Sequence, residues 1–403
     1  MKYYVGIDIG KSHHQAILCD MEAKPLAESL KFSATSEGFE QFFSYLRKHV
    51  SDGDLSLVQA GFEATGPYWL TLYEQLIKQK VKVSVLNPMQ VKAYRNEGIR
   101  GTKTDRIDAL LIVKVLRFGD YKESSIPTED LFALRQLTRL RSDLVQTGTR
   151  TKLKIIGILD QVFPEYQKLF SDIFGTSSQA LLAKAVIPEA IEAIPTKQLT
   201  ALLKKASRGR LGEKQAKAIK NKAQTSIGIT MGIDAFSLSL EILLAQVRHL
   251  EQQVTKLDKE IAKRTTKREE TLTSIPGIGA TQEAIILAEI GNFERFKNDK
   301  NGAEKLVAIA GLDPKIKESG KYIGKAKMSK RGSSYLRKAI RQAAFMAAVG
   351  NGKSKDPMFS KIYEKKISEG KPFEIALSHV GNKMLHVIYS LMKSKKEYKP
   401  NIT

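Results

Sequence analysis

Residues 2–20 read KYYVGIDIGKSHHQAILCD, and this stretch decides the fold of the first part of the chain. Apolar residues alternate around Gly6 over residues 2–9, which is the pattern of a short strand, and Asp8 lies at the end of this strand. After a short turn, residues 14–20 have the pattern of a returning strand. The stretch therefore predicts a β-hairpin that presents a carboxylate at the end of its first strand.

The sequence around this hairpin predicts a mixed α/β domain. The expected order over residues 1 to about 120 is three strands, a helix, a strand, a helix, a strand and a helix. The strands are expected near residues 2–9, 14–20, 26–32, 55–62 and 81–86, and the helices from residue 36 to the turn at 52, over 69–77 and from 105 onward. Strands and helices that alternate in this way are typical of a sheet covered by helices.

Three further acids stand at the ends of predicted elements. Glu63 directly follows the apolar run 55–62, as Asp8 ends the first strand. Asp105 and Asp108 follow Thr104, a residue suited to capping a helix, and their spacing places both on one face of that helix. An isolated pair of this kind is also typical of an acid-capped surface helix, because the helix dipole favours carboxylates in the first turn.

The four carboxylates together suggest a metal site. If the first strand pairs with the strand at 55–62, then Asp8, Glu63, Asp105 and Asp108 converge at one edge of the sheet. Oxygen-only ligands suit Mg²⁺ or Mn²⁺, and two such ions can flank a scissile phosphate. The alternative is four unrelated surface acids.

The charge of the chain favours a polyanionic partner. The 403 residues include 66 Lys and Arg against 43 Asp and Glu, a formal charge of +23. Residues 1–120 hold 16 basic and 14 acidic residues, whereas residues 295–403 hold 25 basic and 9 acidic ones. Nucleic acid is the simplest partner for such a field, and an anionic membrane is disfavoured because no amphipathic aromatic anchor accompanies it.

Cysteine usage and hydropathy indicate a cytoplasmic protein. Cys19 is the single cysteine, which excludes an internal disulfide framework and multi-thiolate metal sites. The first ten residues lack the apolar stretch of a secretory signal, and no apolar run reaches membrane-spanning length.

The middle of the chain is predicted to be helical. Residues 131–154 interleave leucines with basic residues, and residues 240–261 carry apolar residues at heptad spacing. The heptads predict a coiled coil, formed either by self-association or as an intramolecular hairpin with residues 131–160. Residues 165–235 contain further helical pieces without a motif of chemical content.

The last part combines turns with basic residues. The segment Ile275–Gly279 has the form of a helix-hairpin-helix turn, in which the amides of Gly277 and Gly279 can hold a phosphate; an ordinary interhelical turn is the alternative. Ser319 lies in a Gly-containing loop rich in lysine, and taken alone it is typical of turn chemistry. The basic residues expected to contact nucleic acid are Lys11, Lys103, Arg135, Arg139, Arg150, Lys327, Lys330, Arg331, Arg337 and Arg341. For the cluster of Lys330, Arg331, Arg337 and Arg341, a solvated helix face is the alternative.

A succession of short motifs resembles one family across nearly the whole chain. The motifs are GIDIGK at 6–11, FEATG at 62–66, KTDRIDA at 103–109, IPGIG at 275–279, GLDP at 311–314, SG at 319–320, SKRG at 329–332 and LR at 336–337. Each motif is weak, but their order is highly specific. The sequence resembles the DEDD transposases of insertion sequences of the 110 type.

The resemblance implies a fold in three parts. They are an RNase H-like, RuvC-like domain over 1–125, a basic helical and coiled-coil connector over 126–268 and a mostly helical transposase domain over 269–403. It also implies that the four carboxylates are the metal-binding tetrad and that Ser319 is the nucleophile that joins DNA covalently. Members of the family recombine DNA as oligomers, here expected as a dimer or tetramer, guided by a structured non-coding RNA that pairs with donor and target DNA.

The leading hypothesis is therefore a Mg²⁺-dependent, RNA-guided DNA recombinase. A DNA invertase on the same scaffold is a close variant. A RuvC-like nuclease that uses water and leaves Ser319 structural is the alternative mechanism, and a nucleic-acid-binding scaffold is the non-enzymatic one. Because no histidine lies near Ser319 in sequence, we expect metal ions held by the tetrad to activate it, in a composite active site that nucleic acid brings together.

Overall fold

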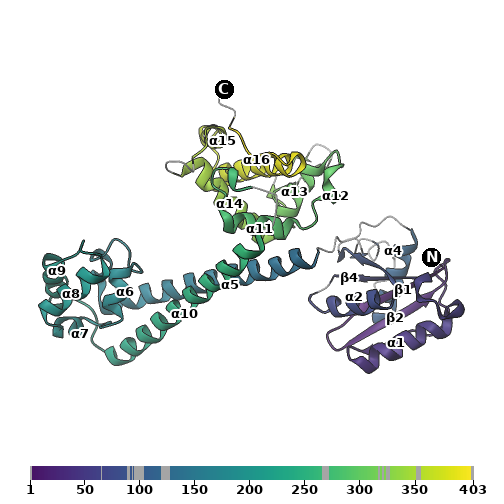
Figure 1. Cartoon of the computed structure of the whole chain (residues 1–403), viewed down its shortest axis with the longest axis horizontal. Helices are drawn as coiled ribbons and strands as arrows, with labels where there is room; N and C mark the ends of the chain where they lie inside the picture. Colours follow the sequence, from purple (N-terminus) through teal and green to yellow (C-terminus); the bar gives the residue numbers. More distant parts are fainter. Residues whose placement is uncertain are drawn as a thin grey trace. The chain divides into compact units, whose positions relative to one another are not determined.

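The chain forms two compact units, Met1–Ile126 and Pro127–Thr403 (Figure 1). The computed structural model describes residues 2–64, 66–88, 91–92, 94, 104–118, 128–265, 272–315, 318–319, 322–323, 327–350 and 355–400. Across these residues, no helix combines the length and apolar character needed to cross a membrane.

The first unit is built on a five-stranded mixed sheet in the order β3-β2-β1-β4-β5. Its strands are β1 (Tyr3–Ile9), β2 (His13–Cys19), β3 (Leu30–Ser33), β4 (Val58–Glu63) and β5 (Lys82–Leu86). The hairpin β1-β2 and the pair β2-β3 are antiparallel, whereas β1-β4 and β4-β5 are parallel. The predicted hairpin is confirmed, and the first strand pairs with the strand before Glu63, which is the condition under which the acids were expected to converge.

Helices cover both faces of this sheet. The helices are α1 (Ser36–His49), α2 (Trp69–Lys78) and α4 (Asp105–Phe118), with short 3₁₀ turns at Ser51–Gly53 and Leu55–Leu57. The phenylalanines of α1 and the leucines of α2 pack against one face of the sheet, together with Val5 and Phe62. The other face receives α4, through contacts such as Val113 with Ile17. The predicted element order is confirmed for the described residues.

The third strand is shorter than predicted. It begins at Leu30, whereas the pattern predicted a start near residue 26. The chain first makes an isolated bridge between Pro25 and Cys19, and Leu26 donates its amide to Leu18. Since proline has no amide to continue a ladder, regular pairing resumes only later.

Two long helices form the arm of the second unit. They are α5 (Glu129–Val162) and α10 (Ile233–Thr265), which lie along each other (Figure 1). Ion pairs connect Arg141 to Asp258 and Lys152 to Glu251. Of the two arrangements open for the heptad segment, the structure contains the intramolecular one; self-association stays a prediction.

Four short helices close one end of this arm. They are α6 (Thr176–Leu182), α7 (Pro188–Ala193), α8 (Thr196–Ala206) and α9 (Glu213–Gln224), preceded by a 3₁₀ turn at Pro164–Lys168. Their apolar faces share one core with Ile155 and Leu159 of α5 and with Leu240 of α10. The segment without chemical motifs is therefore a small helical bundle.

The C-terminal part is mostly helical, as predicted. After a 3₁₀ turn at Leu272–Ser274, its helices are α11 (Ala280–Ile290), α12 (Glu294–Lys297), α13 (Gly302–Ala310), α14 (Ser334–Val349), α15 (Pro357–Ser368) and α16 (Phe373–Ser394). Between α13 and α14 lie four two-residue strands, β6 (Pro314–Lys315), β7 (Glu318–Ser319), β8 (Tyr322–Ile323) and β9 (Lys327–Met328). A core from α11 and α13 through α16 holds these helices together.

Candidate functional site

Two glycines determine how closely α4 approaches the sheet. A Cβ placed on Gly6 would lie 2.0 Å from the carbonyl oxygen of Ala109, and one placed on Gly61 would lie 2.7 Å from the side chain of Leu116. The strands can therefore receive the backbone of α4 only where they lack side chains. As a result, α4 lies directly on the face of the sheet to which Gly6 and Gly61 belong.

The same face carries Asp8 and Glu63. Gly6 pairs with Gly61 in the parallel ladder of β1 and β4. Side chains two residues apart in a strand share a face, so Asp8 and Glu63 follow at one level on the α4 side. Both residues are half-buried.

The other two predicted ligands open α4. The hydroxyl of Thr104 accepts the amide of Ile107 at 3.2 Å, and its carbonyl accepts the amide of Asp108 at 2.9 Å, which confirms the predicted cap. Asp105 is exposed, whereas Asp108 is only 7% exposed and is followed directly by Ala109, which contacts the sheet. The first turn of α4 thus places the carboxylate of Asp105 at the surface and buries the carboxylate of Asp108.

The structure brings the three elements that bear these acids onto one face. In the part of the chain that the structure describes, no three His, Cys, Asp or Glu side chains are close enough together to hold a metal ion. The donor set itself, four carboxylates from separate elements, has the chemistry that Mg²⁺ and Mn²⁺ prefer.

Two polar residues that were not among the predicted site residues lie on the same face of the sheet as Asp8 and Glu63. Gln15 of β2 lies directly opposite Asp8, and Lys31 of β3 lies opposite Gln15. Strand alternation places both on the α4 face, next to the carboxylates. The signal was available in the sequence, because a hairpin register counted from the turn pairs Gln15 with Asp8.

In the second unit, Ser319 lies in a hairpin whose base is tightly closed. Ser319 belongs to β7 and lies opposite Tyr322 of β8. At the base, β6 pairs with β9, and the hydroxyl of Ser329 donates to Asp313 at 2.5 Å. The amide of Lys330 also donates to the carbonyl of Gly311.

Two motif glycines explain how this base closes. Gly311 ends α13 in the left-handed conformation with φ of 64°, and a Cβ there would lie 2.7 Å from the amide nitrogen of Gly332. A Cβ on Gly332 would lie 2.0 Å from the carbonyl oxygen of Ile309. The two motifs that flank the serine therefore meet backbone to backbone, which requires glycine on both sides.

The Ile275–Gly279 turn also has a packing role. Gly277 has φ of 87°, and a Cβ on it would lie 2.4 Å from the carbonyl oxygen of Ala343 in α14. Ile275 and Ile278 are buried on either side. Gly279 is exposed before α11, and phosphate binding at this turn stays a prediction.

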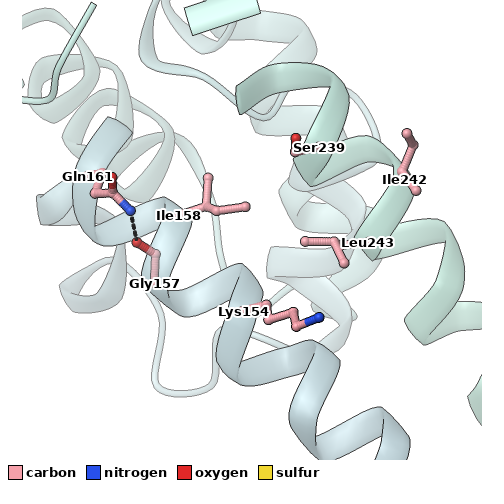
Figure 2. A pocket seen from close by; sticks show the side chains of 7 residues that line it. All are labelled: Lys154, Gly157, Ile158, Gln161, Ser239, Ile242 and Leu243. Carbon is pink, nitrogen blue, oxygen red and sulfur yellow. Dashed lines mark hydrogen bonds between the residues drawn. The ribbon is translucent and has the colours of Figure 1, made fainter. Parts of the chain in front are cut away.

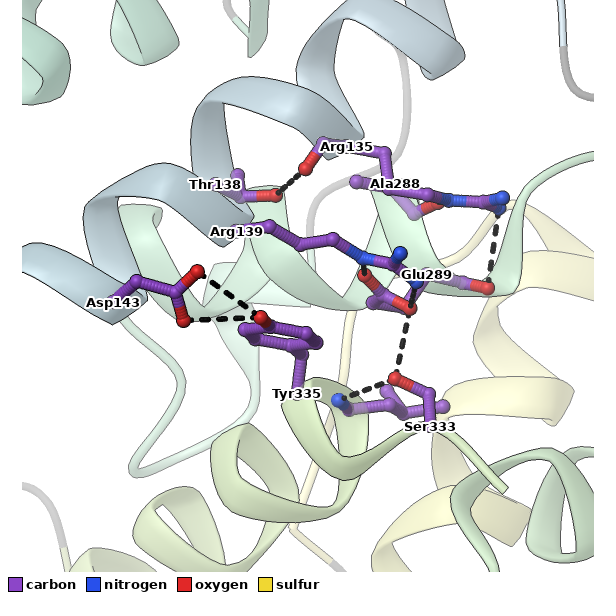
Figure 3. A network of polar contacts seen from close by, with 9 residues as sticks. Arg135, Thr138, Arg139, Asp143, Ala288, Glu289, Ser333 and Tyr335 are labelled. Carbon is purple, nitrogen blue, oxygen red and sulfur yellow. Dashed lines mark hydrogen bonds and ion pairs between the residues drawn. The ribbon is translucent and has the colours of Figure 1, made fainter. Parts of the chain in front are cut away.

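Arg135 and Arg139 of α5 hold helices together. Arg139 donates two hydrogen bonds to Glu289 of α11, at 2.7 and 2.9 Å, and the same carboxylate accepts the hydroxyl of Ser333, the N-cap of α14 (Figure 3). Arg135 donates to the backbone carbonyl of Ala288 at 2.8 Å. The hydrogen bonds to Glu289 raise the pKa of Arg139 above its ordinary value.

The remaining basic residues divide into two groups. Lys11, Arg150, Lys327, Lys330 and Arg331 are exposed. Arg337 donates to the carbonyl of Ala310, and Arg341 forms a bidentate pair with Glu374. Lys103 lies outside the described residues.

A cavity of about 570 Å³ lies between α5 and α10 (Figure 2). Ile158, Ile242 and Leu243 provide apolar walls, and Lys154 is the charged residue among those lining it. None of the described residues that line it carries a carboxylate.

Comparisons with known proteins agree with the order of motifs. A family model described as transposase, for DEDD transposases of the IS110 type, matches residues 5–164. A second model, for transposases of the IS116/IS110/IS902 family, matches residues 269–361, and the two together cover more than half of the chain.

Full-length relatives support the same assignment. The 44.8 kDa protein of insertion element IS116 from Streptomyces clavuligerus is 25% identical over 99% of this chain and 96% of its own length. The pilin gene-inverting protein of Moraxella bovis is 25% identical over 100% of this chain and 99% of its own. The 42 kDa protein of insertion element IS900 from Mycobacterium paratuberculosis is 26% identical over 77% and 75%. The chain therefore belongs to the IS110-type family of DEDD transposases.

Proposed function

We propose that this transposase cuts and rejoins DNA strands through a covalent bond between Ser319 and DNA, with two Mg²⁺ ions held by Asp8, Glu63, Asp105 and Asp108. The observation that carries the metal half of this proposal is the pairing of β1 with β4 under α4, because it gathers the three acid-bearing elements on one face. The serine half rests on the family and on the closed hairpin base that presents Ser319.

The chemistry assigned to Ser319 is a transesterification. Its oxygen forms a bond to a backbone phosphorus while one phosphorus–oxygen bond of the DNA breaks, the serine proton leaves, and the departing strand end takes up a proton as a hydroxyl. A hydroxyl of a second strand then attacks the same phosphorus and releases Ser319 with its proton restored. The number of phosphodiester bonds is unchanged, so the exchange needs no external energy source.

The carboxylates and the serine have different tasks in this scheme. Bound Mg²⁺ would offset the negative charge that develops on the phosphate and favour the deprotonated hydroxyl. Asp108, buried at the start of α4, and Asp8 and Glu63, half-buried on rigid strands, would hold fixed positions while the exposed Asp105 adjusts. Gln15 and Lys31 would contact the phosphate beside the acids.

A structured guide RNA is the second polyanion in the proposal. The formal charge of +23 and the exposed lysines and arginines beside the hairpin base favour more than one nucleic-acid strand. The exposed Arg150 on the arm is the residue proposed to contact RNA along α5. We expect a defined RNA, encoded beside the reading frame, to co-purify with the protein.

The decisive experiment is the capture of a protein–DNA adduct. The protein is incubated with Mg²⁺, DNA that contains the reading frame with its flanks, and RNA transcribed from those flanks, and protease-sensitive gel-shifted DNA is collected. The expected result is an adduct on Ser319 that disappears in Ser319→Ala, in Asp8→Asn and after addition of a chelator. An adduct that survives in Ser319→Ala would overturn the serine mechanism.

A mixture of two inactive variants tests how the site is shared. If Asp8→Asn and Ser319→Ala chains regain adduct formation when mixed, one subunit supplies the carboxylates to the serine of another. If the mixture stays inactive while wild type forms adducts, both sets of residues act within one chain.

The alternative supported by a specific observation is DNA inversion. Two relatives that match 100% of this chain, from Moraxella bovis and Moraxella lacunata, are pilin gene-inverting proteins. Inversion and insertion use the same strand chemistry, and they differ in whether the two recombining sites lie on one DNA molecule. A reporter with the sites in inverted orientation on one plasmid distinguishes the two outcomes.

A further inference from the structure

A cavity of about 390 Å³ opens at the base of the hairpin that carries Ser319. It is lined by Leu312, Met328, Lys330, Ser334, Arg337, Lys338, Ile340, Arg341, Glu374, Leu377, Ser378 and Gly381. These residues come from α14, from α16 and from the chain on either side of the hairpin (Figure 1). The volume lies within the range of about 300–1,000 Å³ that is usual for small-ligand sites.

The cavity has an apolar floor and a basic rim. Leu377 and Ile340 of the floor are buried, and Gly381 beside them packs closely, because a Cβ there would lie 3.1 Å from Ile340 and 3.5 Å from Leu312. Lys330 and Lys338 at the rim are exposed, and neither forms an ion pair with another residue that the structure describes. An apolar floor below cationic groups suits a ligand with a flat ring at one end and a phosphate at the other.

One wall of the cavity is formed by the planar guanidinium of Arg341, whose orientation is fixed by the carboxylate of Glu374. Arg341 donates to both oxygens of Glu374, across the gap between α14 and α16. Such a pair offers a planar surface on which a base can stack, and a carboxylate that can accept an amino group of a base. A nucleobase is therefore a better match to this wall than an aliphatic ligand.

An aromatic pair lies next to this wall. Phe345, one turn beyond Arg341, and Phe373, adjacent to Glu374, are 37% and 40% exposed, and their ring centroids are 6.3 Å apart. Exposed aromatic rings beside basic residues are typical of surfaces that bind single-stranded nucleic acid by stacking. This points to a nucleotide within a strand and not to a free metabolite.

We propose that the cavity binds one unpaired DNA nucleotide, with its base between Leu377 and the Arg341–Glu374 pair and its phosphate at Lys330 and Lys338. The assignment to DNA rests on the proposed function, because the hairpin that Ser319 occupies begins and ends at Leu312 and Met328 of the same cavity. An unpaired nucleotide held here would mark the position of strand exchange relative to the serine.

The test compares binding of four short probes to the full-length protein. They are a fully paired DNA duplex, the same duplex with one bulged nucleotide, the duplex with an abasic bulge and an RNA duplex with the same bulge. We expect the bulged DNA to bind about 10-fold more tightly than the abasic one, which is the usual scale of one stacked base. Equal affinity for the two, or a preference for the base only in RNA, would overturn the assignment.

Filling the cavity gives the second measurement. Ser378, on α16, lines the cavity, and its hydroxyl bonds only to the carbonyl of Glu374 in its own helix among the described contacts. Ser378→Phe should remove the preference for the bulged base and leave binding of the paired duplex unchanged. Ser378→Ala, and His379→Phe at the neighbouring exposed position outside the cavity, should keep the preference.

The outcomes separate this inference from the function on which it rests. If Ser378→Phe keeps the full preference while its helical content matches wild type, the cavity is not the binding site. If the preference behaves as expected but no Ser319 adduct ever forms, the nucleotide site stands and the serine mechanism fails. Lys338→Ala should weaken binding of the bulged DNA. It should leave the ratio of the affinities for the bulged and the abasic DNA unchanged, since Lys338 is proposed to contact only the phosphate.

Discussion

Gly6 is the residue that limits how closely α4 and the sheet can approach. Its missing side chain leaves room for the carbonyl of Ala109, whereas Gly61 faces only the end of the Leu116 side chain. A backbone carbonyl cannot rotate away, but a leucine side chain can adopt another rotamer. The two glycines therefore tolerate a methyl group to different extents.

This difference gives a first prediction. Gly6→Ala should lower the free energy of unfolding of the first unit by about 3 kcal/mol, and Gly61→Ala by about 1 kcal/mol, because overpacking costs more against fixed backbone. Urea unfolding followed by the fluorescence of Trp69, the single tryptophan, measures both. Equal stability of the two variants would show that α4 does not lie where the glycines place it.

Cys19 offers an independent readout of the same contact. The thiol is fully buried against Ala109 and Val113, and burial raises its pKa to about 11. The folded wild type should therefore react with a thiol reagent only through opening of α4. Gly6→Ala should speed this reaction well beyond wild type, while Gly61→Ala should change it little.

His14 predicts a pH dependence of stability. It is 2% exposed among Phe32 and Phe39, and burial, with a smaller effect of His13, lowers its pKa below 6.5. The unfolded chain then binds a proton near pH 6.5 that the folded chain does not, so stability falls as the pH drops below 6.5 and is retained above it.

The measurement is the free energy of unfolding of the first unit between pH 7.5 and 5. One such proton contributes a slope of up to about 1.4 kcal/mol per pH unit. His14→Phe should flatten this slope, whereas His13→Gln, at an exposed position, should leave it in place. A slope that persists in His14→Phe would assign the effect to other groups.

At the scale of elements, Glu289 connects three helices through one carboxylate. Its side chain is 2% exposed, and it accepts hydrogen bonds from Arg139 of α5 and Ser333 at the start of α14. A buried carboxylate is stable only when such partners offset its lost hydration. The junction α5-α11-α14 thus depends on residues that the sequence places far apart.

We expect Glu289→Gln to lower the free energy of unfolding of the second unit by about 3 kcal/mol, because it leaves a partly buried guanidinium without its charge partner. Asp143→Asn is the matched control: Asp143 is exposed and its carboxylate accepts the hydroxyl of Tyr335, so its loss should stay within about 0.5 kcal/mol. Loss of helical circular dichroism on heating compares the two. Similar losses in both variants would contradict a special role for the buried carboxylate.

At the scale of the whole molecule, excess positive charge governs binding to nucleic acid. The charge of +23 predicts that the logarithm of the affinity falls linearly with the logarithm of the salt concentration. Replacing Lys327, Lys330 or Arg331 by Ala should in each case reduce the magnitude of the slope of log affinity against log salt concentration by about 0.9. Lys217→Ala is the control, because Lys217 already pairs with Glu213 in α9. A response to salt as steep in the three variants as in wild type would show that these residues do not contact phosphate.

The sequence alone was sufficient for the local structure and for the family. Hydrophobic alternation and caps indicated the strand and helix order of the first unit, and the observed elements and the Thr104 cap agree with that order. The order of motifs indicated the IS110-type family, which the family models confirm. These features depend on neighbours in sequence, so the pattern of residues is enough to specify them.

Only the tertiary structure decided which residues share a site. Arg139 looked like a phosphate contact because basic residues recur along α5, and it pairs with Glu289, 150 positions away. The motif glycines at 277, 311 and 332 each allow a close backbone contact with another segment. Such roles follow from long-range packing and from the cost of burying charge, which the order of residues along the chain does not encode locally.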